Sequence, residues 1–190
     1  MSAALLSCGL ATLVVRHAGI GDLVQYTMPQ PPLYGSYQEF AIVLGAVIAI
    51  GVVLFDKTQS LLPKFDRKSP KMIVIALLSF AVIGVMSMYF PEILGNGKAG
   101  NQLTFTDLVG WDYALGLLAT KWIAVLLALM AGAYGGRITP SMMLGSTLAL
   151  AFAALWSIMV SPVHLGFAAF IGAVIFLGLA QKMPLTSCVF

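Results

Sequence analysis

A cluster of glycines followed by a threonine–proline pair carries the clearest chemical signal in this sequence of 190 residues. Gly132, Gly135 and Gly136 interrupt an apolar stretch, and Thr139 and Pro140 follow directly after them. Threonine is a good helix N-cap, and proline suits the first helical position because its missing N–H would be unpaired there anyway. The spacing therefore predicts that one helix ends at the glycines and another begins at Thr139.

The residues just ahead of this predicted helix start would lie in an irregular turn, with their amides pointing past the helix. Free amides and roughly half a positive charge from the helix dipole together form a site for an anion. At membrane depth, irregular backbone is tolerated only where protein buries it or where it lines a polar cavity. We therefore predict an anion-binding site at the amides of Arg137 and Ile138, between Gly136 and the pair Thr139 and Pro140, as in the broken helices of a transporter or channel.

Composition places the chain in a membrane. Hydrophobic residues make up 60% of the sequence and charged residues only 9%, with a mean hydropathy of +0.98. Soluble domains carry about 25% charged residues, so we expect an integral membrane protein in contact with lipid. The net charge of +3 is small and local, which gives no support for nucleic-acid binding. The sequence contains no Ser/His/Asp or Cys/His pattern, phosphate loop or His/Glu cluster, so we expect neither an enzyme nor a bound metal or cofactor.

Apolar segments of near-spanning length divide the chain. A transmembrane helix needs about 20 mostly apolar residues. The segments that fit are residues 38–55, 71–90, 113–130, 141–160 and 163–180, whereas residues 2–15 are short for a span. We predict an all-α, polytopic membrane helix bundle, with turn-rich connectors at residues 17–37 and 91–108.

The loop at residues 56–71 predicts the orientation of the chain. It holds half of the ten basic residues, namely Lys57, Lys64, Arg67, Lys68 and Lys71. Basic loops stay on the cytoplasmic side, so this loop should face the cytoplasm in a plasma or inner membrane. The two connectors, which are poor in lysine and arginine, should then face outward.

Small residues recur every four positions on three of the predicted helices. Residues four apart share a helical face, so such a stripe lets another backbone approach closely. The stripes are Gly116, Thr120, Ala124, Ala128 and Gly132; Ser141, Gly145, Ala149, Ala153 and Ser157; and Ala41, Gly45 and Ala49. This repetition predicts a bundle with tight contacts rather than a single-span anchor.

Isolated polar residues have simple structural interpretations. Asp107 and Asp112 fall near the start of a predicted helix, where a carboxylate complements the helix dipole. Lys121 lies inside a predicted span, and we favour snorkelling or pairing with an outward acid over a role in an ion pathway. His17 and His164 lie at span ends, and we expect interfacial side chains rather than proton carriers.

Both ends of the sequence are abrupt. Met1–Val15 is apolar but lacks the basic start of a signal peptide, and Pro184–Phe190 looks like the first turns of a helix. Both features lead us to expect a piece of a longer chain. Cys8 and Cys188 lie in these apolar runs without metal-ligand spacing, so we interpret them as small buried hydrophobes.

Three stretches resemble the CLC family of chloride channels and proton-coupled chloride transporters. GAYGGRITPSMMLGSTLAL resembles the Gly-Gly-x-Phe-x-Pro turn that opens an anion-binding helix in the second half of that family. YFPEILGNGKAGNQL is similar to its Pro-x-x-x-Gly-x-Gly connector, and QKMPLTSCVF to its [R/K]-x-Pro-Leu-Thr helix start. Their order, spacing and sidedness also match.

The resemblance implies a partial CLC-type transmembrane domain over residues 1–190, formed by the second inverted repeat and the last helix of the first. It implies that chloride or a similar anion is held by the amides of Arg137 and Ile138, without a cofactor. This sequence departs from the family by placing Ile138 where phenylalanine is usual. Arg137 has two interpretations: it attracts anions to the site, or it caps the preceding helix and pairs with an acid. In the family, subunits pair as homodimers, and Met1–Val15 would lie at that interface.

Other parts of the family pattern are absent from the sequence. The first-half turns Gly-Ser-x-x-Pro and Gly-x-Glu-x-Pro are missing, and Glu39 and Glu92 are the only glutamates. We therefore expect a chain that needs an N-terminal half to conduct, which leaves open whether the whole is a channel or a proton-coupled exchanger. A second hypothesis is a non-transporting or degenerate membrane remnant that acts only in helix assembly. A third is an unrelated transporter with a broken helix, which fits the physics but not the three ordered stretches.

Overall fold

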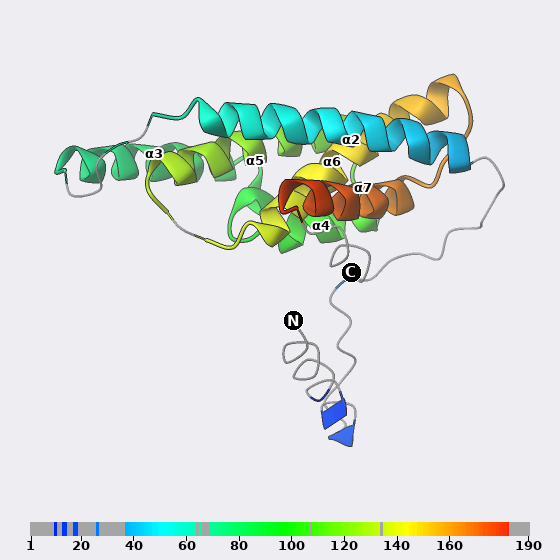
Figure 1. The fold of residues 1–190 in the computed structure, drawn as a ribbon, viewed down its shortest axis with the longest axis horizontal. Helices are drawn as coiled ribbons and strands as arrows, with labels where there is room; N and C mark the ends of the chain where they lie inside the picture. Colours follow the sequence, from blue (N-terminus) through cyan, green and yellow to red (C-terminus); the bar gives the residue numbers. More distant parts are fainter. Residues whose placement is uncertain are drawn as a thin grey trace.

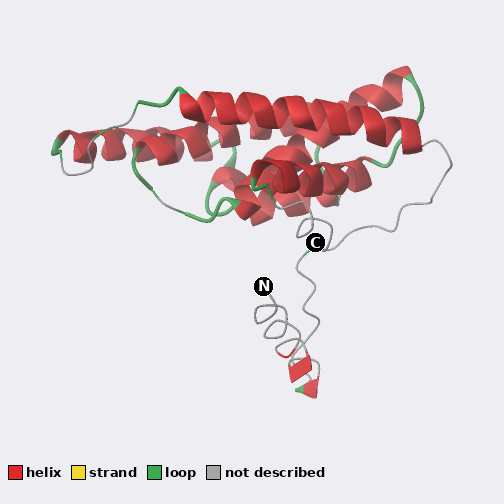
Figure 2. Cartoon of the chain, in the orientation of Figure 1, coloured by secondary structure: helices red, strands yellow, loops and turns green. Residues whose placement is uncertain are grey.

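A computed structural model describes residues 10, 13–14, 17–18, 26, 37–63, 65, 69–106, 108–133 and 135–182. Helices are the regular elements of this part of the chain (Figure 2). In order they are α2 (Tyr37–Ser60), α3 (Lys71–Ser87), the 3-10 helix η1 (Pro91–Ile93), α4 (Lys98–Phe105), α5 (Trp111–Met130), α6 (Ile138–Met159) and α7 (Leu165–Ala180). The fold is that of an all-α membrane protein, as predicted.

Three helices have the length and apolar composition needed to cross a membrane. They are residues Gln38–Ser60, Trp111–Met130 and Ile138–Met159. The other two predicted spans, α3 and α7, are apolar helices of 17 and 16 residues. At 1.5 Å per residue, α7 is about 24 Å long, which is less than the roughly 30 Å of a bilayer core.

Helix α6 is the centre of the bundle. It packs against α2, α4, α5 and α7, and more than half of its spanning window is buried. Figure 1 shows α2, α6 and α7 side by side, with the short α4 below them. The start of α6, which contains the predicted anion turn, is therefore held by several neighbouring elements.

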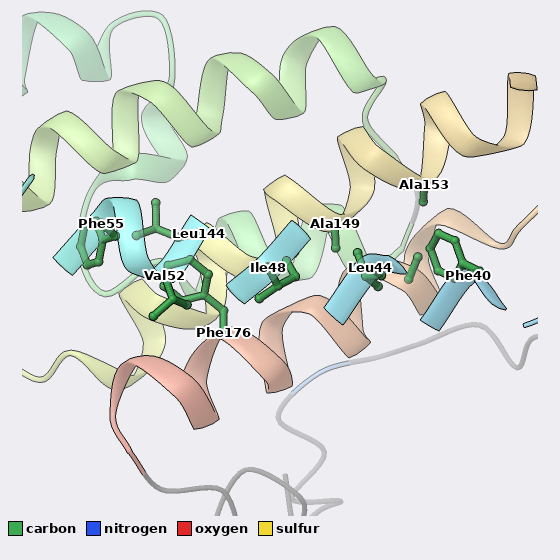
Figure 3. Close-up of a cluster of buried hydrophobic side chains, with 10 residues drawn as sticks. Phe40, Leu44, Ile48, Val52, Phe55, Leu144, Ala149, Ala153 and Phe176 are labelled. Carbon is green, nitrogen blue, oxygen red and sulfur yellow. The ribbon is translucent and has the colours of Figure 1, made fainter. Parts of the chain in front are cut away.

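Large side chains on one face of α2 form a core cluster with α6 and α7. The α2 members recur every three or four residues, whereas α6 and α7 contribute mostly smaller side chains and one phenylalanine (Figure 3). The cluster includes Phe40, Leu44, Ile48, Val52 and Phe55 from α2, Leu144, Ala149 and Ala153 from α6, and Phe176 from α7. This spacing places all five α2 residues on one helical face, which is the face that turns inward.

The small-residue stripe of α6 packs as predicted. A Cβ added to Gly145 would lie 2.3 Å from the carbonyl oxygen of Gly172 in α7, and a Cβ added to Gly172 would lie 2.2 Å from the Cβ of Ala149. The two backbones are therefore in direct contact, and neither glycine position has room for a side chain.

The other two stripes behave differently from the prediction. On α5, Gly116 makes room for the aromatic ring of Phe90 rather than for a helix backbone. On α2, a Cβ added to Gly45 would meet nothing within 4 Å. No other helix backbone therefore approaches α2 closely at Gly45, and α2 turns its larger residues inward instead.

Candidate anion site

The segment between α5 and α6 changes direction at a left-handed glycine. Gly132 has a φ of 73°, a conformation that other residues adopt only at a cost, and α5 ends just before it at Met130. Gly135, Gly136 and Arg137 belong to no regular element, and α6 begins at Ile138. The predicted break between two apolar helices is therefore present in the structure.

The helix after the break begins earlier than predicted. Arg137, rather than Thr139, is the N-cap of α6, and no side chain caps the helix. Thr139 and Pro140 lie inside the first turn instead, where a missing proline N–H is still harmless because the first four amides of a helix have no intrahelical partner. The predicted role of Thr139 as N-cap is wrong because Arg137 already has right-handed helical dihedrals, with φ −89° and ψ −8°.

The amides at the start of α6 have no acceptor among the described residues. The first backbone hydrogen bond of the helix runs from the N–H of Ser141 to the carbonyl of Arg137, at 3.0 Å. Gly136, Arg137 and Ile138 are exposed, and Thr139 and Pro140 are half-buried. The five predicted site residues thus lie together at an open helix end.

This helix end borders a cavity of about 470 Å³. Gly136, Arg137 and Pro140 are in its lining, whereas Ile138 and Thr139 are not. Other walls come from the end of α2, from α3, from the connector after α3, from α5 and from the end of α7. The charged residues in the lining are Asp56, Lys121 and Arg137. No ion pair joins the Arg137 guanidinium to a described carboxylate, so the acid-pairing interpretation of this residue finds no support in the described chain.

Lys121 differs from the prediction. It is only 3% exposed, and its ammonium donates to the carbonyl oxygens of Ile93 at 2.7 Å and Gly95 at 3.2 Å. The side chain neither snorkels to the membrane surface nor pairs with an acid of the described chain. Its partners are main-chain carbonyls, which no sequence pattern marks beyond the glycine-rich composition of the connector.

The connector after α3 is also more ordered than predicted. Residues 98–105 form the helix α4, in which Gly100, Asn101, Thr104 and Phe105 are buried. Asn101 accepts a hydrogen bond of 3.0 Å at its Oδ1 from the Ser146 hydroxyl of α6. Part of the segment predicted to be outward-facing turns is therefore a buried helix packed against α6.

A further contact holds the start of α6 from the opposite side. The Gln181 side chain, just past the end of α7, donates through Nε2 to the hydroxyl oxygen of Ser141 at 3.2 Å. Both residues line the cavity. Ser141 belongs to one of the predicted small-residue stripes, and nothing in the sequence predicts its hydrogen bond with Gln181.

The remaining polar predictions have mixed outcomes. Asp112 lies in the first turn of α5, as predicted. His164 is the N-cap of α7, where its Nδ1 accepts the N–H of Phe167 at 3.3 Å. His17 is exposed, with its Nδ1 3.1 Å from the carbonyl oxygen of Leu13.

Several predicted features lie outside the described residues. They are Asp107, both cysteines, residues 183–190, most of residues 1–36, and Lys64, Arg67 and Lys68 of the basic loop. The first five residues of the predicted loop, 56–60, are instead the last turn of α2, which extends to Ser60.

Comparisons with known proteins place these features in one family. The family model described as "Voltage gated chloride channel" matches residues 1–190. The H(+)/Cl(-) exchange transporter ClcA of Vibrio vulnificus strain YJ016 is 27% identical over 199 residues, which cover 97% of this chain and 41% of that protein. ClcA of Vibrio parahaemolyticus is 28% identical over 165 residues, covering 80% of this chain and 34% of its own length. The chain thus spans between about a third and two fifths of the length of these curated relatives. No solved structure gives a significant match.

Proposed function

Because the chain belongs to the voltage-gated chloride channel family, we propose that it takes part in anion transport across a membrane. The transported ion is chloride or a similar small inorganic anion, and no cofactor takes part. The anion is held at the start of α6 by the main-chain amides of Arg137 and Ile138, within the turn formed by residues 136–140. The observation that carries this proposal is an open helix start, in a membrane-type chain, that borders a mostly apolar cavity whose lining also includes the charged residues Asp56, Lys121 and Arg137.

The physical argument begins with the amides. Their partial positive charges add to the positive end of the α6 dipole, and both act on an anion in surroundings of low dielectric constant. A halide accepts hydrogen bonds from any direction, so backbone N–H groups suffice and no particular side chain is needed. Because α6 is fixed by its neighbours, these donors need little rearrangement when an anion arrives.

Arg137 adds a full charge to this arrangement. Its side chain lines the cavity beside the open amides. In the proposed mechanism the guanidinium raises the local concentration of anions, which is an electrostatic effect that salt weakens. Ile138, in the place where phenylalanine is usual in the family, contributes its amide.

We further propose that the chain is not competent alone. One helix start offers donors from one side only, and pores in transporters built from inverted repeats lie between the two repeats. The chain covers about two fifths of its curated relatives, so other membrane segments would supply the remaining walls. Homodimer formation and a cytoplasmic location of the loop after α2 belong to the same proposal.

Flux measurements in liposomes test the transport function. The chain is reconstituted alone, and also together with the part of the Vibrio vulnificus exchanger that the alignment leaves uncovered, and radioactive chloride efflux is followed. We expect flux from the combination and none from the chain alone. Absence of flux in both preparations, with both chains folded and co-purified, would favour a role in helix assembly without transport.

A pair of variants at position 137 separates the amide from the side chain. Arg137→Gln removes the charge and keeps the N–H, whereas Arg137→Pro removes both. The observed φ of −89° lies about 24° from the usual proline value, beyond its scatter of about 15°, so the proline variant requires a small backbone adjustment at position 137. The preceding Gly136 tolerates the added ring. A hydrogen bond to a charged group is worth about 1.5–3 kcal/mol, so the proline variant should bind chloride about ten- to a hundredfold more weakly than the glutamine variant. Equal chloride affinity in the two variants would refute the role of the amide.

A further inference from the structure

The ammonium of Lys121 is a buried charge without a described acid partner. It lies in the middle of α5, is 3% exposed, and donates to the carbonyls of Ile93 and Gly95. A lysine inside a membrane-type helix is costly to keep, and such residues usually serve a specific purpose. The Lys121 ammonium binds the main chain of the connector that follows α3.

The far end of this connector lies against the beginning of α6. Gly97 has a φ of 92° and is the N-cap of α4. A Cβ added there would lie 3.0 Å from the sulfur of Met143 and 3.5 Å from the carbonyl oxygen of Thr139, both in the first turns of α6. Gly97 therefore packs directly against the Met143 side chain and lies close to the Thr139 carbonyl, so a movement of the connector would disturb the first turns of α6.

The same elements form facing parts of the cavity. Lys121, Gly95 and Asn96 line it on the side of α5 and the connector, and Arg137 and Pro140 line it at the start of α6. A shift of the connector would therefore change the lining of the cavity that the start of α6 borders. Loss of the ammonium would leave the carbonyls of Ile93 and Gly95 without their donor and would free the connector to shift.

We propose that Lys121 is a positioning residue for the anion turn, acting through the connector at residues 93–97 on the first turns of α6. This inference rests on the proposed function, because it assigns to Lys121 the task of setting the geometry in which the amides of Arg137 and Ile138 meet an anion. Lys121 touches no transported ion in this mechanism. Its effect is on the affinity and selectivity of the site.

Three variants test the proposal. Lys121→Met keeps a long side chain and removes the donor, and Lys121→Arg keeps a positive donor. Trp122→Phe is the matched control, since the next residue of α5 donates through Nε1 to the Thr58 hydroxyl of α2, at 3.1 Å, away from the connector. Chloride flux is measured as a function of chloride concentration, together with the permeability ratio of chloride to nitrate.

We expect Lys121→Met to raise the half-saturating chloride concentration by about three- to thirtyfold and to change the permeability ratio. Lys121→Arg should recover both values at least in part, and Trp122→Phe should leave both unchanged even where it lowers thermal stability. A folded Lys121→Met protein with wild-type half-saturation and selectivity would overturn the proposal. So would a Trp122→Phe variant that alters them equally.

Hydrogen exchange gives a second measurement that does not depend on transport. In the detergent-solubilised chain, Lys121→Met should speed amide exchange both in residues 93–98 and at Ser141 and Met142 in α6, whereas Trp122→Phe should not. Faster exchange in the connector alone would overturn the coupling. If the unmodified assembly carries no chloride, the proposed function fails, and the exchange result still decides whether Lys121 positions the turn.

Discussion

Replacing Gly145 by alanine tests how closely α6 and α7 must approach. The new Cβ would lie 2.3 Å from the carbonyl oxygen of Gly172 and 2.5 Å from the Cβ of Phe176. Ordinary carbon–oxygen contacts are about 3.3 Å or longer, so the two helices would have to separate by about 1 Å. Overpacking of this kind costs about 1–3 kcal/mol, and we expect the upper end because the nearest obstructing atom belongs to the backbone and cannot rotate away.

The matched control is Gly45→Ala on α2. There the new methyl group would meet nothing within 4 Å. Both substitutions gain up to about 1 kcal/mol of helix propensity, so this contribution cancels when the two variants are compared. The difference in their free energies of unfolding is then the cost of forcing α6 and α7 apart.

Tryptophan fluorescence during unfolding of the detergent-solubilised chain provides the assay, since Trp122 and Trp156 lie on two of the helices that pack together. We expect Gly45→Ala to be at least as stable as the unmodified chain and Gly145→Ala to be less stable than Gly45→Ala by about 2–3 kcal/mol. Equal stability of the two variants would show that α6 and α7 do not make the direct backbone contact described above.

Three further substitutions probe the elements around α6. Ser146→Ala leaves the buried Oδ1 of Asn101 without its donor and should lower the free energy of unfolding by about 1–3 kcal/mol in the same assay. Trp122→Phe removes the hydrogen bond to Thr58 and should cost about 0.6 kcal/mol and at most about 1.7 kcal/mol, the average and the maximum measured for side-chain hydrogen bonds between membrane helices. Gly97→Ala imposes a left-handed conformation on a residue with a Cβ, at about 1–2 kcal/mol, and should speed amide exchange at the start of α4, where the N–H of Asn101 bonds to the carbonyl of residue 97.

The positions of the main helices could be predicted because membrane helices are defined by length and hydropathy. The five predicted spans coincide with α2, α3, α5, α6 and α7. Their ends were less predictable. Charged residues such as Asp56 and Lys57 suggested the end of a span, yet α2 continues to Ser60 because charged side chains are compatible with a helix once it leaves the apolar layer.

Helix α4 could not be predicted because tertiary packing, rather than local propensity, stabilises it. Its sequence contains glycine and asparagine, which favour turns. In the structure Gly100 makes room for Met143, because a Cβ at position 100 would lie 2.3 Å from the methionine methyl carbon. Asn101 accepts a hydrogen bond from Ser146 of α6. Both contacts depend on residues more than forty positions away, as the numbers show.

The helix break that bounds the candidate site could be predicted from the sequence. The glycine cluster and the adjoining proline located the break between α5 and α6, because these residues have few conformational alternatives. The partners of Lys121 could not be predicted, because every residue carries a carbonyl and nothing in the sequence marks those of Ile93 and Gly95 as the acceptors. The prediction of Thr139 as N-cap is wrong. It rests on the preference of threonine for that position, whereas the backbone dihedrals make Arg137 the N-cap of α6.

The contrast between the two parts of α6 bears on its role. From Ser141 to Thr147 every residue is buried, whereas Arg137 and Ile138 at its start are exposed. Neighbouring elements hold the buried part: Gln181 bonds to Ser141, Gly97 lies against Met143, and the backbone of α7 touches Gly145. A segment that only linked two helices would not require the following helix to be fixed in position. A turn that presents its amides to an anion does need one, because donors that are already fixed in place lose little conformational freedom on binding.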